Sequence, residues 1–232
     1  MDTSLFLLLL AMTGFVGLHV GLSLPAVRSQ LIATMGSTGF QAAYSVQAAV
    51  LLVLVALAYR SASYLPLWTL SWATWLPILV MPLAFWLLVG ALSTRNPTAA
   101  GPAGGAAPAA STRLPLYTAI TRHPMLWGIL LWALAHLLAN GDLASLFLFG
   151  GLGLLSVAGM WGIDAKKRAD PAYDFQALAR RTSLIPFAAT LAGRNRLQAR
   201  WSDAVRLVVA LLLYGGLMHA HTWLFGVPAY PV

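Results

Sequence analysis

The chain has 232 residues, of which 59% are hydrophobic and only 9% are charged. Soluble domains carry roughly a quarter charged residues, so this composition excludes a protein whose whole surface faces water. The absence of cysteine excludes disulfides, thiolate metal sites and cysteine nucleophiles. The net charge of +8 does not indicate nucleic-acid binding, because the basic residues gather on one side of a predicted membrane.

Six apolar segments follow one another along the chain. A helix that crosses a bilayer needs about 20 apolar residues. The segments are Thr3–Leu24, Ala42–Tyr59, Leu65–Leu92, Pro124–Ala139, Ser145–Ile163 and Leu207–Gly226. We therefore predict an all-α fold, a polytopic membrane helix bundle of about six transmembrane helices. We expect residues 1–232 to form a single integral membrane domain.

Two segments between these helices are predicted to lie outside the bilayer. A flexible loop is expected near residues 93–115, which are rich in Ala, Gly and Pro, and a cytoplasmic loop over residues 164–204. Asp170-Pro171 is typical of a helix start, so a short helix is predicted over Pro171–Arg181. Its apolar and basic residues are expected at the membrane interface, and a solvated loop is the alternative. These residues are Tyr173, Phe175, Leu178, Arg180 and Arg181.

The basic residues predict the orientation. If the N-terminus lies outside, thirteen of the fourteen lysines and arginines fall on the inner side, and only Arg60 falls on the outer side. We therefore expect a multi-pass protein of the cell inner membrane with both termini in the periplasm. Its expected partners are the lipid bilayer and an apolar substrate, with an oligomer or a membrane partner left open.

Histidines inside a membrane are candidates for function, because an ionisable side chain is costly there. His19 lies in the first apolar segment, where Gly17-xxx-Gly21 favours close packing of helices. At 100° per residue His19 points about 200° away from Gly17. We therefore expect the helix to pack through its glycine face and to present His19 to another group. A histidine that hydrogen-bonds to a neighbouring helix is the alternative.

His136 lies in the fourth segment on a stripe with Gly128 and Trp132, which recur every four residues. A glycine, an aromatic ring and a histidine on one face suit a flat cofactor, while ordinary helix packing is the alternative. The following Asn140-Gly141-Asp142 predicts a glycine-based helix end and an Asp142 cap on the next helix.

Three further histidines lie at or near helix ends. His123 and Arg122 precede Pro124 at a helix start, which predicts either an anion site or a pair that extends to the interface. His219 and His221 lie on nearly opposite faces of the last helix, so at most one points inward. Several intramembrane histidines in a chain without Cys or Glu favour haem over zinc or a di-metal centre.

One long motif resembles a known family. The run T-R-H-P-M-L-W-G-I-L-L-W-A-L-A-H-L-L-A-N-G-D (Thr121–Asp142) is similar to the signature of the NnrU family, which includes the zeta-carotene isomerases of plants and cyanobacteria. His19 and the run R-R-T-S-L-I-P-F-A-A-T-L-A-G-R (Arg180–Arg194) agree with it. The resemblance covers most of the chain.

The resemblance implies a haem b that is held between two histidines and assists cis–trans isomerisation of a linear polyene. Carried over by motif, His19 and His136 would be both the ligands and the catalytic residues, with Gly128, Trp132 and His221 as further cofactor contacts. The isomerases have a cysteine three residues before the second ligand; here Ala133 stands there, which excludes exchange with a thiolate. The alternative within the family is an accessory protein of denitrification and nitric oxide metabolism.

Depth along the helices bears on the second ligand. At 1.5 Å per residue, His19 lies about 9 Å and His136 about 18 Å from the inner ends of their helices, so the two are not level. His221, at about 22 Å by the same rise, is the reserve ligand.

A weaker resemblance is to isoprenylcysteine-type membrane methyltransferases, through Arg122-His123-Pro124 and Ile185-Pro186-Phe187. Those proteins usually carry a pair of Glu residues after the next helix, where this chain has only Asp164.

Overall fold

The computed structural model describes residues 2–98 and 113–230 and is built from helices. An isolated β-bridge joins Pro66 and Asp142. Five helical segments are long and apolar enough to span a membrane: Thr3–Gly21, Pro25–Ser61, Ser71–Ser93, Leu143–Ala169 and Trp201–Phe225. Together with the shorter apolar helix Pro124–Asn140, they confirm the predicted all-α membrane fold. Most of the expected loop near 93–115 lies outside the described residues.

Residue contacts divide the chain into two compact units. Unit 1 comprises residues 1–73 and 133–155, and unit 2 comprises residues 74–132 and 156–232. Helices α5 (Pro124–Asn140) and α7 (Gly151–Ala169) contribute residues to both units.

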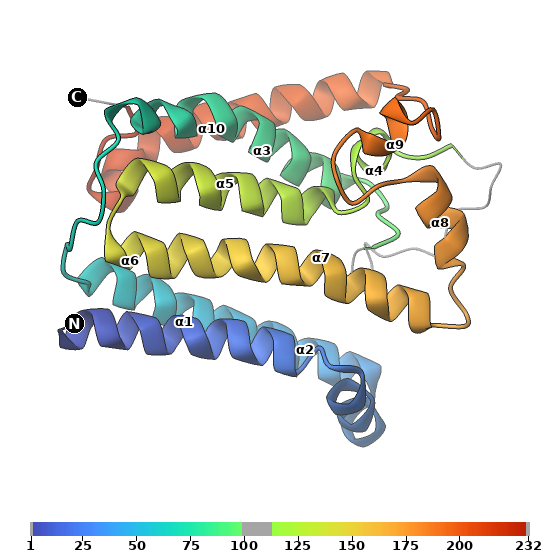
Figure 1. The fold of residues 1–232 in the computed structure, drawn as a ribbon, viewed down its shortest axis with the longest axis horizontal. Helices are drawn as coiled ribbons and strands as arrows, with labels where there is room; N and C mark the ends of the chain where they lie inside the picture. Colours follow the sequence, from blue (N-terminus) through green and yellow to red (C-terminus); the bar gives the residue numbers. More distant parts are fainter. Residues whose placement is uncertain (1, 99–112, 231–232) are drawn as a thin grey trace. The chain divides into compact units, whose positions relative to one another are not determined.

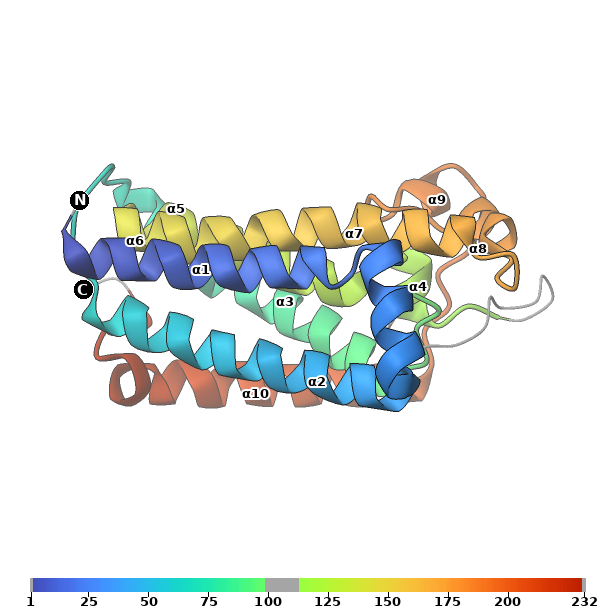
Figure 2. The same ribbon diagram turned by 90° about the horizontal axis from the view of Figure 1, so that it is seen from below.

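Unit 1 is formed mainly by α1 (Thr3–Gly21) and α2 (Pro25–Ser61), which pack along each other. Gly36 interrupts α2 with a positive φ of 75°, and the helix changes direction there, as Figure 2 shows. This unit also holds α6 (Leu143–Ser145) and the π-helical turn η3 (Leu146–Gly150).

The link between α5 and α6 in unit 1 confirms two local predictions. Gly141 ends α5 with a positive φ of 65°, and the Asp142 carboxylate accepts a hydrogen bond from the Ser145 N–H at 3.0 Å. The Gly141 carbonyl also accepts from the backbone N–H groups of Leu67 and Trp68 at 2.8 and 3.0 Å. A side chain at position 141 would meet the Trp68 carbonyl oxygen at 2.1 Å, so glycine is required there for space as well as for φ.

Unit 2 contains α3 (Leu76–Ser93) and α10 (Trp201–Phe225), which run side by side in Figure 1. The Tyr214 hydroxyl of α10 donates to the Ile78 carbonyl of α3 at 3.1 Å. The short helices α4 (Leu116–Ile120), α8 (Phe175–Arg181) and α9 (Ala188–Leu191) belong to the same unit.

Helix α8 begins later than the sequence predicted. Asp170 caps only a turn, in which its carboxylate accepts from the Ala172 N–H at 2.9 Å. The N-cap of the helix is Asp174, whose carboxylate accepts from the Ala177 N–H at 2.9 Å. Two acidic caps four residues apart compete, and the chain uses the second for the helix.

The interfacial position predicted for the apolar residues of this segment was wrong. Tyr173, Phe175 and Leu178 form a buried cluster in unit 2. The Tyr173 hydroxyl donates to the Pro97 carbonyl at 3.0 Å, and burial raises the pKa of Tyr173 to about 12. The cluster therefore packs on protein rather than on lipid.

Gly90 of α3 provides a test of packing in unit 2. A Cβ at this position would lie 2.1 Å from the ring of the fully buried Tyr117. Gly90→Ala is therefore expected to cost about 1–3 kcal/mol through overpacking, measured as a lower midpoint of thermal unfolding in detergent. Gly14→Ala is the matched control, because a Cβ there meets nothing within 4 Å. An equal loss in the two variants would contradict the close approach of Gly90 to Tyr117.

Candidate functional site

His19 lies near the C-terminal end of α1 and is half-buried. Its Nδ1 lies 2.9 Å from the Phe15 carbonyl oxygen, which can only accept, so Nδ1–H donates and a neutral ring carries its lone pair on Nε2. Its ring centroid lies 4.3 Å from that of Phe15 and 5.3 Å from that of Tyr44 of α2. A backbone carbonyl on the second nitrogen is how proteins commonly orient a metal-binding histidine.

The packing face of α1 differs from the prediction. The helix buries Leu5, Leu8, Met12 and Phe15, and His19 continues this stripe one turn further on. A Cβ at Gly14, Gly17 or Gly21 would meet nothing within 4 Å, so the glycine face makes no close helix contact within the described residues. His19 therefore belongs to the packed face of α1, where the large apolar side chains make more van der Waals contacts than the glycines do.

His136 lies near the C-terminal end of α5, also in unit 1, and is half-buried. Its ring centroid is 5.3 Å from that of Phe149 in η3. The ring centroid of Phe149 in turn lies 6.1 Å from that of Tyr59 of α2. The Tyr59 hydroxyl oxygen is 3.0 Å from the Ser145 hydroxyl oxygen. His136 thus joins an aromatic cluster at the C-terminal end of α2.

The two histidines therefore associate with different parts of α2. His19 contacts Tyr44, whereas His136 contacts Phe149, which in turn contacts Tyr59. Tyr44 and Tyr59 are fifteen residues apart in the sequence. At 1.5 Å per residue this separates them by about 22 Å along the helix. Two imidazoles on opposite sides of one metal ion need nitrogens only about 4 Å apart, twice a metal–nitrogen bond. The donor type fits haem, and His19 fits as one axial ligand, but the structure does not place His19 and His136 as a pair.

Gly128 and Trp132, the other members of the His136 stripe, belong to unit 2. A Cβ at Gly128 would lie 2.8 Å from Leu88 Cγ and 3.1 Å from the Ala84 carbonyl oxygen, both in α3. The space beside Gly128 is therefore filled by helix packing, which was the alternative to a cofactor contact. Trp132 is half-buried on the same helix.

His221 lies in unit 2 near the C-terminal end of α10. Its Nδ1–H donates to the Val227 carbonyl at 2.8 Å, and its ring centroid lies 4.8 Å from that of Phe225. His219, two residues earlier, is exposed. The contacts of His221 within unit 2 are thus local to the end of its own helix.

Sequence reasoning missed a polar side chain on α2. Both polar atoms of the Gln47 amide are buried and have no hydrogen-bond partner in the described part of the chain. Gln47 follows Tyr44 by three residues and so shares the face of α2 that meets His19. An unpaired buried amide is unusual and costly, so it marks a place where a bound group or water would find a hydrogen bond. The sequence does carry a signal for this residue, because Gln47 is a single amide side chain within the apolar segment Ala42–Tyr59.

Arg122 and His123 form a buried ionic cluster with Asp164 of α7, within unit 2. The Arg122 Nε–H donates to both Asp164 carboxylate oxygens at 3.0 and 2.8 Å. The His123 Nε2 lies 2.8 Å from Asp164 Oδ1 and donates to it. The three residues are 9%, 2% and 6% exposed, so neither an open anion site nor a pair extended into the interface describes them.

Hydrogen bonds from the neighbouring segments hold this cluster in place. The Arg122 Nη1 donates to the Thr182 hydroxyl at 3.3 Å, and the Arg122 N–H donates to the Ser183 carbonyl at 2.9 Å. The Thr98 hydroxyl donates to the Arg122 carbonyl at 2.6 Å. Because Arg122 is engaged by Asp164, it is not presented to a carboxylate ligand, which argues against the methyltransferase alternative.

The remaining titratable groups do not form a metal centre by themselves. No group of three or more His, Asp or Glu side chains with metal-binding geometry occurs among the described residues. The residues that could hold a cofactor are therefore single imidazoles, and His19 and His221 each have an Nδ1–H that donates to a backbone carbonyl.

Comparisons with known proteins agree with the motif. A model of the family described as "NnrU protein" matches residues 7–229. The chain is 37% identical over 89 residues to "15-cis-zeta-carotene isomerase, chloroplastic" of Arabidopsis thaliana, which covers 38% of this chain and 24% of that protein. It is 39% identical over 80 residues to the protein of the same name from Zea mays, covering 34% and 21%. The chain thus matches about a quarter or less of the length of these curated relatives. No solved structure matches the chain.

Proposed function

Because the chain belongs to the NnrU family, we propose that it is a membrane isomerase that converts a cis double bond of a linear polyene to the trans form, with haem b bound at His19. The observation that carries the proposal is the similarity to two curated proteins named as isomerases of 15-cis-zeta-carotene. Because the match spans only part of those proteins, the proposed activity rests on this partial similarity and on the chemistry of the His19 site.

The geometry of His19 supports the cofactor. The Phe15 carbonyl fixes the ring so that Nε2 carries the lone pair that a metal requires. Tyr44 packs against the edge of the ring and limits its rotation. When bound, haem supplies an iron centre whose redox state the protein tunes through its axial ligands and surroundings.

His136 is the second candidate ligand of unit 1. Its binding to the same iron requires a movement of the end of α5 relative to α2, because its present neighbour is Phe149. The unpaired Gln47 amide, on the α2 face that contacts His19, would donate to or accept from a polar group of whatever binds there.

An apolar substrate suits the outer surface of the helices. The spans expose large apolar side chains along their length, among them Leu7, Leu10, Val50, Val53 and Leu212. A polyene dissolved in the bilayer would therefore reach the protein laterally and without leaving an apolar medium.

Co-expression with a carotenoid pathway that stops at the cis polyene tests the activity. In such cells the chain is expected to shift the cis-to-trans ratio of the polyene, measured by chromatography of extracted pigments in the dark. The His19→Ala variant, expressed to the same level, is the control and should leave the ratio at that of empty cells. An unchanged ratio with haem-loaded wild-type protein would reject the isomerase and leave an accessory role in nitric oxide metabolism.

We also propose that the protein lies in the cell inner membrane with both termini in the periplasm. Six apolar helices return the chain to the side on which it began, and the basic residues gather between them on the other side. A reporter fused at Asn195 is expected to read cytoplasmic, and one fused after Val232 to read periplasmic. A periplasmic reading at Asn195 would contradict this topology.

A further inference from the structure

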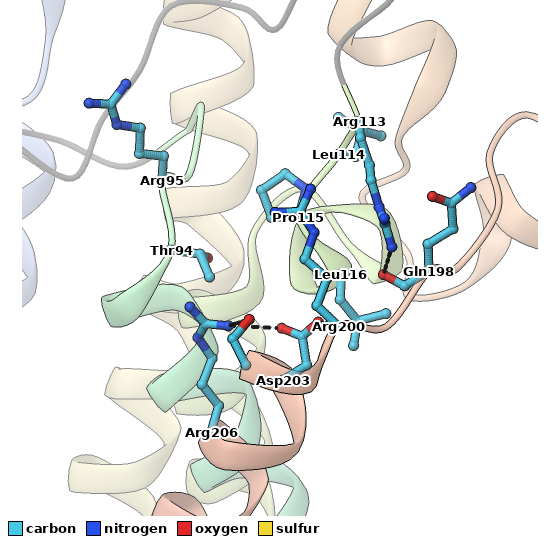
Figure 3. A pocket seen from close by; sticks show the side chains of 11 residues that line it. Thr94, Arg95, Arg113, Leu114, Pro115, Leu116, Gln198, Arg200, Asp203 and Arg206 are labelled. Carbon is cyan, nitrogen blue, oxygen red and sulfur yellow. Dashed lines mark hydrogen bonds and ion pairs between the residues drawn. The ribbon is translucent and has the colours of Figure 1, made fainter.

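A basic pocket lies at one end of the two packed helices α3 and α10, within unit 2. It has a volume of about 240 Å³ and is lined by residues that follow α3, precede α4 and begin α10. Four arginines belong to its lining: Arg95, Arg113, Arg200 and Arg206. Figure 3 shows the Arg95 side chain pointing away from the other three. The one acidic residue of the lining is Asp203, so the pocket carries a net positive charge of about three, because arginine stays protonated.

The arginines are not equivalent. Arg206 is already paired, since its Nη1 donates to Asp203 Oδ1 at 3.0 Å and its Nε to the Ser93 hydroxyl oxygen at 2.8 Å. The Arg113 Nη2 donates to the Gln198 carbonyl at 2.9 Å, a contact drawn in Figure 3. The guanidinium groups of Arg95 and Arg200 have no hydrogen bond or ion pair to any described residue. Two uncompensated cations therefore border the same cavity.

The surroundings place this charge at the surface of the membrane. Both helices are candidate spans, and the pocket lies where α3 ends at Ser93 and α10 begins at Trp201. Trp201 is 83% exposed, and tryptophan is enriched at the level of lipid headgroups. Basic pockets between membrane helices commonly bind the headgroups of anionic lipids.

A second basic pocket adjoins the first. It has a volume of about 440 Å³ and shares Arg113, Leu114 and Gln198 with it. Its lining adds Arg181, Arg194 and Arg196. The positive surface thus continues from the end of α3 across the segment that precedes α10, and Arg113 stands between the two pockets.

From these observations we propose that the pocket between the ends of α3 and α10 binds a phosphate group, which an anionic phospholipid of the inner leaflet supplies. Arg200 donates to its oxygens, Arg113 flanks it, and the exposed Arg95 side chain turns toward it on binding. Guanidinium groups match phosphate geometry because they donate paired hydrogen bonds. The site is separate from His19, so its occupancy does not depend on haem or on isomerisation.

The double variant Arg95→Gln/Arg200→Gln tests the site in the full-length protein. Purified protein in neutral detergent is mixed with phosphatidylglycerol or phosphatidylcholine, and bound lipid is counted by native mass spectrometry. The wild type is expected to retain phosphatidylglycerol in preference to phosphatidylcholine, and the double variant to bind it at least about tenfold more weakly, because the charge-assisted hydrogen bonds of two guanidinium groups are lost. Arg28→Gln/Arg60→Gln removes the same charge elsewhere and should bind as the wild type does.

A second probe separates the sources of phosphate. In one outcome, inorganic phosphate raises the unfolding midpoint of the wild type but not of the double variant, while the two lipids bind equally well. That result would retain the phosphate site but would show that its ligand is free phosphate and not a lipid headgroup. Should the double variant be unstable without any probe, Arg95→Gln alone supplies the comparison. The proposal would be overturned if the two double variants bound phosphatidylglycerol equally well, or if the wild type responded neither to phosphatidylglycerol nor to inorganic phosphate.

Discussion

Replacing Asp164 with Asn is expected to destabilise the protein by about 3–5 kcal/mol, because the change leaves Arg122 and His123 buried without their shared anion. The Arg122 Nε and the His123 Nε2 each lie 2.8 Å from a carboxylate oxygen of Asp164. For a chain of this length the loss corresponds to a fall in the unfolding midpoint of roughly 6–20 °C. The protein is heated in detergent to a series of temperatures, and the fraction that remains folded is measured by size-exclusion chromatography.

Asp170→Asn is the matched control for this prediction. Asp170 is exposed and caps only the turn before Tyr173, so its replacement is expected to cost at most about 1 kcal/mol. If Asp164→Asn proved no more harmful than Asp170→Asn, the buried cluster would not be a stabilising part of unit 2.

Replacing His19 with Ala is expected to have the largest effect on haem content. Under the proposed function, the variant loses the imidazole whose orientation the Phe15 carbonyl fixes, so haem should fall at least about tenfold, as metal affinity does when a ligand's supporting partner is removed. The measurement is the ratio of Soret to protein absorbance after purification. His136→Ala should retain haem at His19 but give five-coordinate, high-spin iron if His136 is the second ligand.

His221→Ala is the matched control, since this histidine contacts Val227 and Phe225 at the end of its own helix. Its haem content and absorption spectrum should equal those of the wild type. A high-spin spectrum in His221→Ala, with His19→Ala spectrally silent, would assign the cofactor to unit 2 and contradict the proposal.

Local patterns in the sequence predicted the helices and some of their ends. Long apolar runs located the spans, because the bilayer thickness dictates their length, and they predicted Thr3–Gly21 and Pro124–Asn140 to within three residues at both ends. The second span begins at Pro25, seventeen residues before the predicted start, and the last begins at Trp201, six residues before it. Gly141 and Asp142 act as predicted, since a glycine helix end and an N-cap need only neighbouring residues. Asp170 and Asp174 show the limit of such rules: two caps four residues apart are equivalent locally, and tertiary packing of Phe175 and Leu178 selects the second.

Contacts between distant segments were not predictable in the same way. Nothing near Arg122 in the sequence indicates Asp164, forty-two residues later, as its partner. The face of α1 that packs was likewise misjudged, because glycines that permit close approach do not require it, and in this helix Phe15 and Met12 make the packing contacts instead. The depth estimate along single helices already indicated that His19 and His136 are not level, but it did not indicate their neighbours, Tyr44 of α2 and Phe149 of η3.

The absorption spectrum of wild-type protein purified in mild detergent from haem-replete cells tests the proposed cofactor-dependent isomerase most directly. We expect a red protein with about one haem per chain, held at His19, and a Soret band that shifts on reduction with dithionite. A folded, monodisperse but colourless protein would contradict it, and with it the assignment of His19 as a ligand.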